Sequence, residues 1–190
     1  GALNDVGAPV RENSGDSYRL GVEADAVLKI TDKWFVRPNV TLSLNRNEDF
    51  KFERDGVLQE LGDTNIAFSP NVVAGNAITF IPIKDLNFSL LSKFVGSQYM
   101  GNIDSEQSKL ESYAVSDVSI SYSFKPKSIF KSIVFSALVN NVFDYQYESN
   151  GYFYTFDDDY SQPNVITTIE GAGYYPQAGS NFLVGMTLKF

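Results

Sequence analysis

The sequence predicts an all-β chain whose antiparallel strands form part of a transmembrane β-barrel. Apolar residues recur at every second position in segments of about ten residues, and no segment of useful length follows the 3.6-residue period of a helix. The connections between the segments alternate strictly between short and long. A strand of about ten residues, tilted near 40°, spans about 25 Å, which is the height of the apolar band of a membrane barrel.

Composition bounds the class of protein. The chain has 190 residues, of which 43% are apolar and 14% aromatic, enough for one domain with a substantial core and too apolar for a disordered chain. Its net charge of −8 opposes the basic surface that nucleic-acid binding requires. The sequence has no Cys and no His, which excludes thiolate metal sites and the usual triads of hydrolases. We therefore expect no enzyme activity, no cofactor and no metal.

The first two strands have one apolar and one polar face. The first, at residues 17–30, places Leu20, Val22 and Leu28 on one face and charged residues on the other. The second, at residues 34–45, follows the same pattern, with Pro38 interrupting its apolar face. Such alternation is typical of a strand that separates an apolar from a polar environment.

Five further strands follow the same rule. They are expected at residues 71–81, 86–100, 113–124, 132–141 and 180–190. The fourth is long for a strand of a soluble domain. The last ends directly on an aromatic residue, Phe190.

The connections favour a membrane barrel over a soluble sandwich. Short links lie at 31–33, 82–85 and 125–131, and long links at 46–70, 101–112 and 142–179. A meander of antiparallel strands places all short links at one end and all long links at the other, as in outer-membrane barrels. The link at 46–70 carries charges of both signs and is expected to be a solvated loop or a short hairpin.

Seven strands do not close a bacterial barrel, which has an even number of strands and no free edge in lipid. Residues 1–16 lack alternation and are expected to be the end of another long loop. The chain begins at Gly1, with neither Met nor a leader. We therefore expect a processed chain or a piece of a longer one, forming about seven C-terminal strands of a larger barrel.

Four segments give the chain a resemblance to the C-terminal part of a TonB-dependent outer-membrane receptor. LVNNVFDYQY at 138–147 is similar to the penultimate strand of that family and its Asn-x-Phe-Asp turn. YYPQAGSNF at 174–182 resembles the approach to the last strand, although Ser180 stands where members commonly have Arg. FVGSQY at 94–99 and the ending LKF at 188–190 also fit the family. The resemblance covers residues 86–190 by landmarks and residues 17–81 by pattern.

The resemblance implies a barrel of about 22 strands around an N-terminal plug, with these strands as its last seven. It implies uptake of a scarce nutrient, such as a ferric siderophore, haem, cobalamin or an oligosaccharide, across the outer membrane of a bacterium. No plug sequence is present here. The implied partners are the rest of the barrel and the plug, a TonB-type energy-coupling complex in the periplasm, lipid and lipopolysaccharide. Phe190 would be the signal read by the outer-membrane assembly machinery, and a surface lipoprotein partner is left open.

The last long link is the richest candidate for ligand binding. No Lys or Arg lies between residues 144 and 179, and aromatic faces can stack on sugars and cations. The alternative is an aromatic girdle at the membrane interface with a solvated acidic tip. The candidate residues are Tyr145, Tyr147, Tyr152, Tyr154, Asp157, Asp158 and Asp159, and the neighbouring aromatic residues are Phe153, Phe156 and Tyr160. The Asp triplet lacks the ligand spacing of an EF-hand loop.

Charged residues on the strands are expected to line the lumen and to face a plug. Arg or Lys at mid-depth in lipid would cost about 2 to 4 kcal/mol. The candidates are Arg19, Glu23, Asp25, Arg37, Lys93 and Asp117.

Two other readings remain open. One is a small autonomous outer-membrane barrel, an adhesin or structural protein, with residues 1–16 helping to form an eighth strand. Its interior would have to hold all of these charges. The other is a soluble carbohydrate-binding β-sandwich. A hydrolase is remote, because no nucleophile–base pair is visible.

Overall fold

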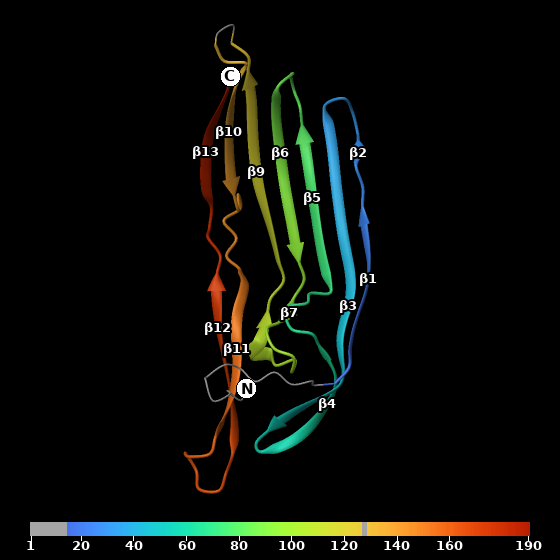
Figure 1. The fold of residues 1–190 in the computed structure, drawn as a ribbon, viewed down its shortest axis with the longest axis vertical. Coiled ribbons are helices and arrows are strands. Elements are labelled where there is room, and N and C mark those ends of the chain that lie inside the picture. Colours follow the sequence, from blue (N-terminus) through green and yellow to red (C-terminus); the bar gives the residue numbers. More distant parts are fainter. Residues whose placement is uncertain (1–14, 127–128) are drawn as a thin grey trace.

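The computed structural model describes residues 15–126 and 129–190 and contains one large antiparallel sheet (Figure 1). Its strands follow the order β1-β3-β5-β6-β9-β10-β13, and β2 and β4 pair with β3 outside this path. The strands of the path are β1 (Ser17–Asp25), β3 (Trp34–Arg54), β5 (Val72–Phe80), β6 (Leu86–Val95), β9 (Tyr113–Phe124), β10 (Ser132–Asn140) and β13 (Asn181–Lys189). The prediction of an antiparallel all-β chain is confirmed, and the sheet is open, with β1 and β13 at its two edges.

The smaller elements belong to the connections. They are β2 (Leu28–Lys29), β4 (Val57–Asn65), β7 (Gln98–Tyr99), the 3-10 helix η1 (Glu106–Ser108), β8 (Lys109–Leu110), β11 (Glu148–Asp158) and β12 (Thr167–Pro176). β11 pairs with β12, and β7 pairs with β8. Within the described residues, no helix has the length and hydropathy needed to span a membrane.

The register keeps apolar residues opposite apolar residues across the sheet. One cross-strand row runs Trp34, Phe80, Phe88, Ile120, Ala137 and Val184. Trp34 and Phe80 stack with their ring centroids 4.4 Å apart. Because the period of a strand is 2, this register gives the whole sheet one apolar face and one polar face. Cross-strand contacts of this kind contribute about 0.2 to 1 kcal/mol per pair.

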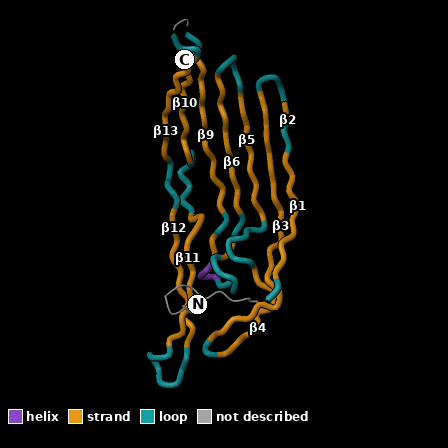
Figure 2. Tube along the Cα trace, viewed as in Figure 1, coloured by secondary structure: helices purple, strands orange, loops and turns teal. Residues whose placement is uncertain are grey.

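The two ends of the sheet differ as the spacing of the links predicts. The links β2–β3, β5–β6 and β9–β10 lie at one end together with the C-terminus, at the top of Figure 1. The long links containing β4, β7–β8 and β11–β12 lie at the opposite end, which we call the loop end (Figure 2). The connections that contain further strands and the 3-10 helix thus lie at one end of the sheet.

The structure differs from the sequence prediction mainly in the long links. The strand expected to end at residue 45 continues to Arg54. It pairs with β4, with register irregularities near Phe50, so the link at 46–70 contains a hairpin, one of the two alternatives expected for it. The link at 142–179, expected to be a loop, contains the β11–β12 hairpin. Both hairpins extend past the ends of the neighbouring strands at the loop end (Figure 1).

Several strand boundaries also differ. The segment expected at 17–30 is divided into β1 and β2, the segment expected at 71–81 begins at Val72, and the segment expected at 86–100 ends at Val95. Residues 1–14, which belong to the segment expected to be the end of a long loop, lie outside the described residues. Asp16 accepts a hydrogen bond from the Glu48 N–H through its carbonyl at 2.9 Å.

Buried apolar side chains are few and lie at the loop end. Among the described residues they are Phe50, Val95, Met100 and Leu110. The apolar face of the sheet is open, with Leu20, Val22 and Val184 each at least 66% exposed. No second layer covers this face within residues 15–126 and 129–190, so the arrangement does not support a β-sandwich.

Candidate ligand-binding face

The exit of β10 and the approach to β13 are joined by a corner built on Asn141. The Asn141 amide donates to the Tyr145 carbonyl at 2.8 Å and to the Ala178 carbonyl at 3.3 Å, and its Oδ1 accepts from the Tyr145 N–H at 3.0 Å. Asp144 accepts from the Ser180 N–H at 2.7 Å. Asn141 and Asp144 both have positive φ, of 48° and 52°, which Asn and Asp tolerate better than other side chains. The Asn-Val-Phe-Asp segment therefore has a structural role.

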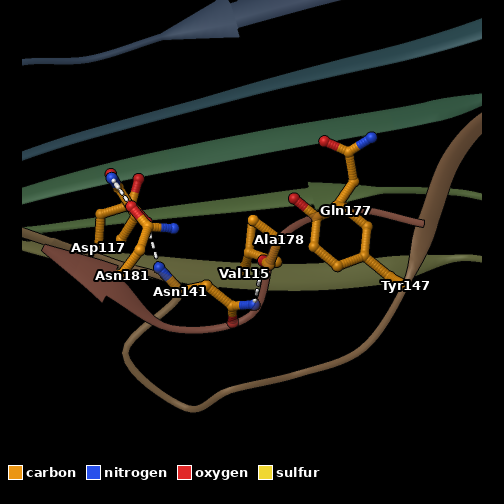
Figure 3. Close-up of a pocket in the computed structure, with 8 residues that line it drawn as sticks. Val115, Asp117, Asn141, Tyr147, Gln177, Ala178 and Asn181 are labelled. Atoms are coloured by element: carbon orange, nitrogen blue, oxygen red, sulfur yellow. Dashed lines mark hydrogen bonds between the residues drawn. The ribbon is translucent and has the colours of Figure 1, made fainter. Parts of the chain in front are cut away.

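A pocket of about 250 Å³ lies beside this corner on the polar face (Figure 3). Asp117 accepts a hydrogen bond from the Asn141 N–H at 2.8 Å, and Asn140 donates to Asn181 at 2.9 Å. Tyr147 and Gln177 complete the wall. The pocket thus presents amide donors and acceptors, one carboxylate and one aromatic ring.

The β11–β12 hairpin carries a row of aromatic rings. Tyr152, Tyr154 and Phe156 follow one another at every second position of β11, and successive ring centroids lie 6.3 and 6.4 Å apart with interplanar angles of 18° and 17°. Their side chains are 51%, 50% and 44% exposed. Tyr175 of β12 joins the row at 6.0 Å from Tyr152. These rings form one continuous exposed surface.

Glycines on β12 let the tyrosine rings lie across the hairpin. Gly173 is opposite Tyr152, and Gly171 is opposite Tyr154. A Cβ added to Gly173 would lie 2.5 Å from Cε1 and Cζ of Tyr152, and one added to Gly171 would collide with the Tyr154 ring. The absence of side chains at these two positions therefore sets the orientation of the rings.

The aromatic row continues the polar face of the sheet. The Gln177 N–H donates to the Tyr147 carbonyl at 2.9 Å, which extends the β11–β12 ladder toward the pocket. Since side chains alternate, Gln177 and Tyr175 leave the same face of β12. Tyr147 stacks on Tyr113 of β9 at 4.4 Å, and Tyr113 shares the polar face with Asp117. We call this surface the aromatic face: Tyr113, Tyr147, Tyr152, Tyr154, Phe156 and Tyr175.

The candidate residues of the last link therefore separate into two groups. Tyr147, Tyr152 and Tyr154 lie on the aromatic face, and Tyr145 stacks beside Tyr147 at 6.3 Å. Of the Asp triplet, Asp157 lies on the opposite side of β11 and accepts from the Thr168 hydroxyl at 2.7 Å. A hydrogen bond from the Ser161 side chain, together with the backbone N–H groups of Ser161 and Tyr160, holds the pKa of Asp158 below its ordinary value.

The opposite side of the hairpin is tied to the other long links. The Arg54 guanidinium and the Ser105 hydroxyl both donate to the Glu170 carboxylate. Asp55 and Thr168 exchange two hydrogen bonds of 2.7 Å each. These contacts join residues more than 60 positions apart in sequence and hold the three long links together as one unit.

Burial alone would raise the pKa of Glu170, but the hydrogen bonds from Ser105 and Arg54 and the charge of Arg54 outweigh that effect and lower it. The Glu170 side chain is only 12% exposed. The carboxylate is therefore held charged at the junction of the three links.

The six charged residues expected to line the lumen all lie on the polar face. One cross-strand row contains Asp25, Asn39, Gly75, Lys93 and Val115, and the next contains Arg37, Ala77, Leu91 and Asp117. Glu23 is opposite Thr41, and Arg19 is opposite Asn45. Within residues 15–126 and 129–190, none of the six forms a salt bridge. Asp117 differs from the others because it bonds to the corner at Asn141.

Several residues of the site were not found from the sequence. Tyr113, Tyr175, Gln177 and Asn181 reach the aromatic face or the pocket only through the pairing of distant strands. A usable signal was present in the Gly-x-Gly of residues 171–173, which matches the Tyr-x-Tyr of residues 152–154 across the hairpin. Phe190 is 70% exposed at the end of β13, and its ring lies 5.0 Å from that of Phe130. No group of three or more potential metal ligands occurs in the part of the chain that the structure describes.

Comparison with known proteins gives matches in structure only. No family model and no curated sequence matches the chain. The ferric yersiniabactin uptake receptor FyuA from Yersinia pestis superposes with a TM-score of 0.58 at 21% identity, covering 92% of this chain and 23% of that one. The siderophore receptor PiuA from Acinetobacter baumannii gives 0.59 at 18% identity, with 90% and 22% covered. The ferric-catecholate import receptor Fiu from E. coli K12 gives 0.63 at 17% identity, with 99% and 23% covered.

These matches confirm, at the level of the fold, the resemblance to TonB-dependent receptors. The chain spans about a quarter of the length of the receptors that it matches. Its open antiparallel sheet has the fold of a segment of their barrel wall.

Proposed function

We propose that this chain forms part of the barrel wall and the extracellular loops of a TonB-dependent outer-membrane transporter that takes up a scarce nutrient. The observation that carries the proposal is the open antiparallel sheet with one apolar and one polar face, which superposes on three siderophore receptors. Neither edge strand has a second partner within the described residues, and an unpaired edge is not tolerated in lipid. Further strands would pair with β1 and β13 in the complete barrel.

The two faces of the sheet set its orientation in the proposed barrel. The apolar face would contact lipid, because burying its exposed side chains in hydrocarbon is favourable. The polar face would line the lumen, where Arg19, Glu23, Asp25 and Arg37 would remain hydrated or pair with a plug. The loop end would then lie outside the cell, and the short turns would lie in the periplasm.

In this arrangement, the chain binds and guides a ligand and changes no chemical bond. The loop end would meet the ligand first, and the aromatic face would lead from the hairpin to the pocket beside Asp117. Movement of the ligand into the periplasm would require a plug rearranged by an energy-coupling partner, as in the family that the chain resembles. The nutrient could be a ferric siderophore, haem, cobalamin or an oligosaccharide.

The test is the size and composition of the assembly that contains this chain. Membranes are extracted with detergent, the assembly is captured with an antibody against residues 157–166, and its mass is measured by light scattering with subtraction of detergent. We expect a particle several times larger than the 21.1 kDa of this chain, in which sequencing identifies further β-rich sequence and a plug.

Two results would overturn the proposal. A stable particle of about 21 kDa in detergent would favour the small autonomous barrel. Recovery of the chain in the aqueous fraction without detergent would favour a soluble protein.

A further inference from the structure

We propose that the aromatic face and the adjoining pocket bind an uncharged oligosaccharide, stacking sugar rings on the aromatic face and bonding hydroxyls in the pocket. This inference rests on the proposed function, because it assigns a ligand class to the surface that would line the extracellular mouth of the transporter. Three independent observations carry it: the orientation of the rings, the distribution of charge and the chemistry of the pocket.

The rings are held in an orientation suited to stacking. Along β11 the successive rings of Tyr152, Tyr154 and Phe156 are within 18° of parallel and about half exposed, whereas Tyr175 is tilted by 48° from Tyr152. One face of the Tyr152 ring packs against Gly173, and one face of the Tyr154 ring packs against Gly171. The opposite face of each ring is therefore the one that a ligand can contact. A fixed aromatic surface binds flat apolar ligand faces with little loss of conformational entropy, because the rings are ordered before the ligand arrives.

The charges of the hairpin exclude an anionic ligand from this surface. No Lys or Arg lies between residues 144 and 179. The Arg54 guanidinium, which reaches the hairpin from the link at 46–70, lies on the opposite side of the hairpin and is bonded to Glu170. An anion here would meet no compensating cation, whereas the recognition of carboxylate or phosphate ligands depends on Arg and Lys.

Two carboxylates of the Asp triplet are bonded within the hairpin. Asp157 points away from the aromatic face, toward Thr168. Asp158 is at the tip, where its carboxylate is bonded by two backbone N–H groups. These two carboxylates therefore contribute to the structure of the hairpin itself. A neutral ligand with flat faces fits a surface that offers aromatic rings and no Lys or Arg.

The pocket adds the polar contacts that a sugar requires. Asn140, Asn181 and Gln177 supply amide groups, each able to donate and to accept, and Asp117 supplies acceptors. Sugar hydroxyls also donate and accept, so they match amides better than they match isolated charges. Tyr147 stands between the pocket and the hairpin and is part of both.

The experiment measures binding of neutral and anionic probes to the detergent-purified assembly by isothermal titration calorimetry. The neutral probes are uncharged gluco-, manno- and xylo-oligosaccharides of six units, and the anionic probe is a ferric tris-catecholate. The test variant is Tyr152→Leu with Tyr154→Leu, which keeps apolar side chains on the strand and removes the flat rings. The double change to Phe keeps the rings, and Tyr160→Ala is the matched control, because Tyr160 is 77% exposed outside the aromatic face.

We expect at least one neutral oligosaccharide to bind, the Leu variant to bind it about tenfold or more weakly, and the Phe and Tyr160→Ala variants to bind it within about twofold of the parent. The mass and heat-modifiability of each variant on gels verify that it is folded. Binding of the ferric catecholate that is lost in the Leu variant would overturn the inference, as would binding of no neutral probe or equal binding by the Leu variant. In each of these cases, a receptor-sized assembly would leave the proposed function standing.

Discussion

Asn141 shows how a single side chain fixes the passage between two strands. It is 5% exposed, and its amide satisfies backbone groups of Tyr145 and Ala178 that would otherwise be unpaired. Its positive φ adds a second constraint that few residues other than Gly and Asp meet. The motif that supports the family resemblance is thus explained by local hydrogen bonding.

Replacing Asn141 with Ala is expected to lower the free energy of unfolding by about 1 to 2 kcal/mol, because it removes the hydrogen bonds that this buried side chain makes to the backbone of Tyr145 and Ala178. The measurement is the midpoint of guanidinium unfolding of the detergent-purified assembly, followed by circular dichroism. Asn150→Ala is the control, since Asn150 is exposed and bonds only to the adjacent Gly151 N–H. Equal midpoints for the two variants would contradict the structural role of Asn141.

Glu170 makes the contact between the long links sensitive to acid. A carboxyl whose pKa is lower in the folded form stabilises that form above its unfolded pKa, and the stabilisation is lost as the pH falls through the folded pKa. The usual pKa of Glu is about 4.3, and that of Glu170 lies below its ordinary value. The links should therefore stay joined at neutral pH and separate at pH values below about 4.

Hydrogen exchange of the amides of residues 167–176 measures this effect. The parent is expected to exchange faster as the pH falls below about 4, after correction for the intrinsic rate. Glu170→Gln should exchange faster than the parent at pH 7, by the loss of about 1 to 2 kcal/mol of local stability, and should lack the acid-dependent step. An acid step of full size in Glu170→Gln would assign the effect to another group.

At the residue scale, ligand binding by the last long link stays a prediction, and the structure divides its candidate residues between the two faces of β11. Adjacency in sequence suggests a single cluster of Tyr152, Tyr154 and the Asp triplet. In the structure, β11 separates Asp157 from the rings, since neighbouring side chains leave opposite faces of a strand. The register shift between Glu148 and Asn150, which brings Tyr147 and Tyr152 to one face, has no sequence signature.

At the scale of elements, the β11–β12 hairpin depends on pairing between its tyrosines and glycines. The rings of Tyr152 and Tyr154 cover backbone that a side chain on β12 would otherwise cover. Glycine normally weakens a strand, and here the ring across from it supplies the missing contact. The hairpin is therefore stabilised by the same arrangement that orients its rings.

Gly173→Ala is expected to destabilise the hairpin by about 1 to 3 kcal/mol, because the new methyl group would overlap the Tyr152 ring. In a Tyr152→Ala background the same change should cost much less, since the space is then free. The double-mutant cycle is measured by hydrogen exchange of the hairpin amides. Gly62→Ala is measured separately as a glycine replacement without a clash, because its new Cβ would meet no atom within 4 Å and would cost only the strain of its positive φ. Additive effects of the two changes would show that the ring does not occupy that space.

The strands of the sheet were predicted well, and the strands beyond it were not. Alternation at 113–124 and 132–141 marks β9 and β10 closely, because one face is apolar throughout. The end of β3 was missed because residues 46–54 are mostly polar and their pairing with β4 is irregular. The contact between Arg54 and Glu170 joins positions 116 residues apart, and no local pattern encodes it.

At the scale of the whole molecule, the two faces of the sheet differ in polarity, as the proposed barrel requires. Ile78 lies in an apolar cross-strand row with Val36, Leu90 and Val118, whereas Thr79 lies on the opposite face, next to Ser89 and in one row with Ser119. A charged side chain should therefore destabilise the proposed barrel at position 78 and have little effect on its stability at position 79.

Ile78→Arg is expected to destabilise the inserted barrel by about 2 to 4 kcal/mol, the cost of Arg on a lipid face at mid-depth. Thr79→Arg should change stability by less than about 1 kcal/mol, because its side chain would stay in water. The fraction of heat-modifiable protein on gels, measured after refolding into vesicles over a range of urea concentrations, compares the two. A greater loss for Thr79→Arg would reverse the assignment of the faces.

The open edges at β1 and β13 also have a consequence for the order of events during biogenesis. Each edge presents a ladder of unsatisfied backbone groups, which recruits other strands in water and is forbidden in hydrocarbon. In the proposed barrel, closing the ring would require partner strands beyond this sheet, and such non-local pairing is slow. The last strands would then have to pair at nearly the same time as the barrel enters the lipid, because an unpaired edge is costly there.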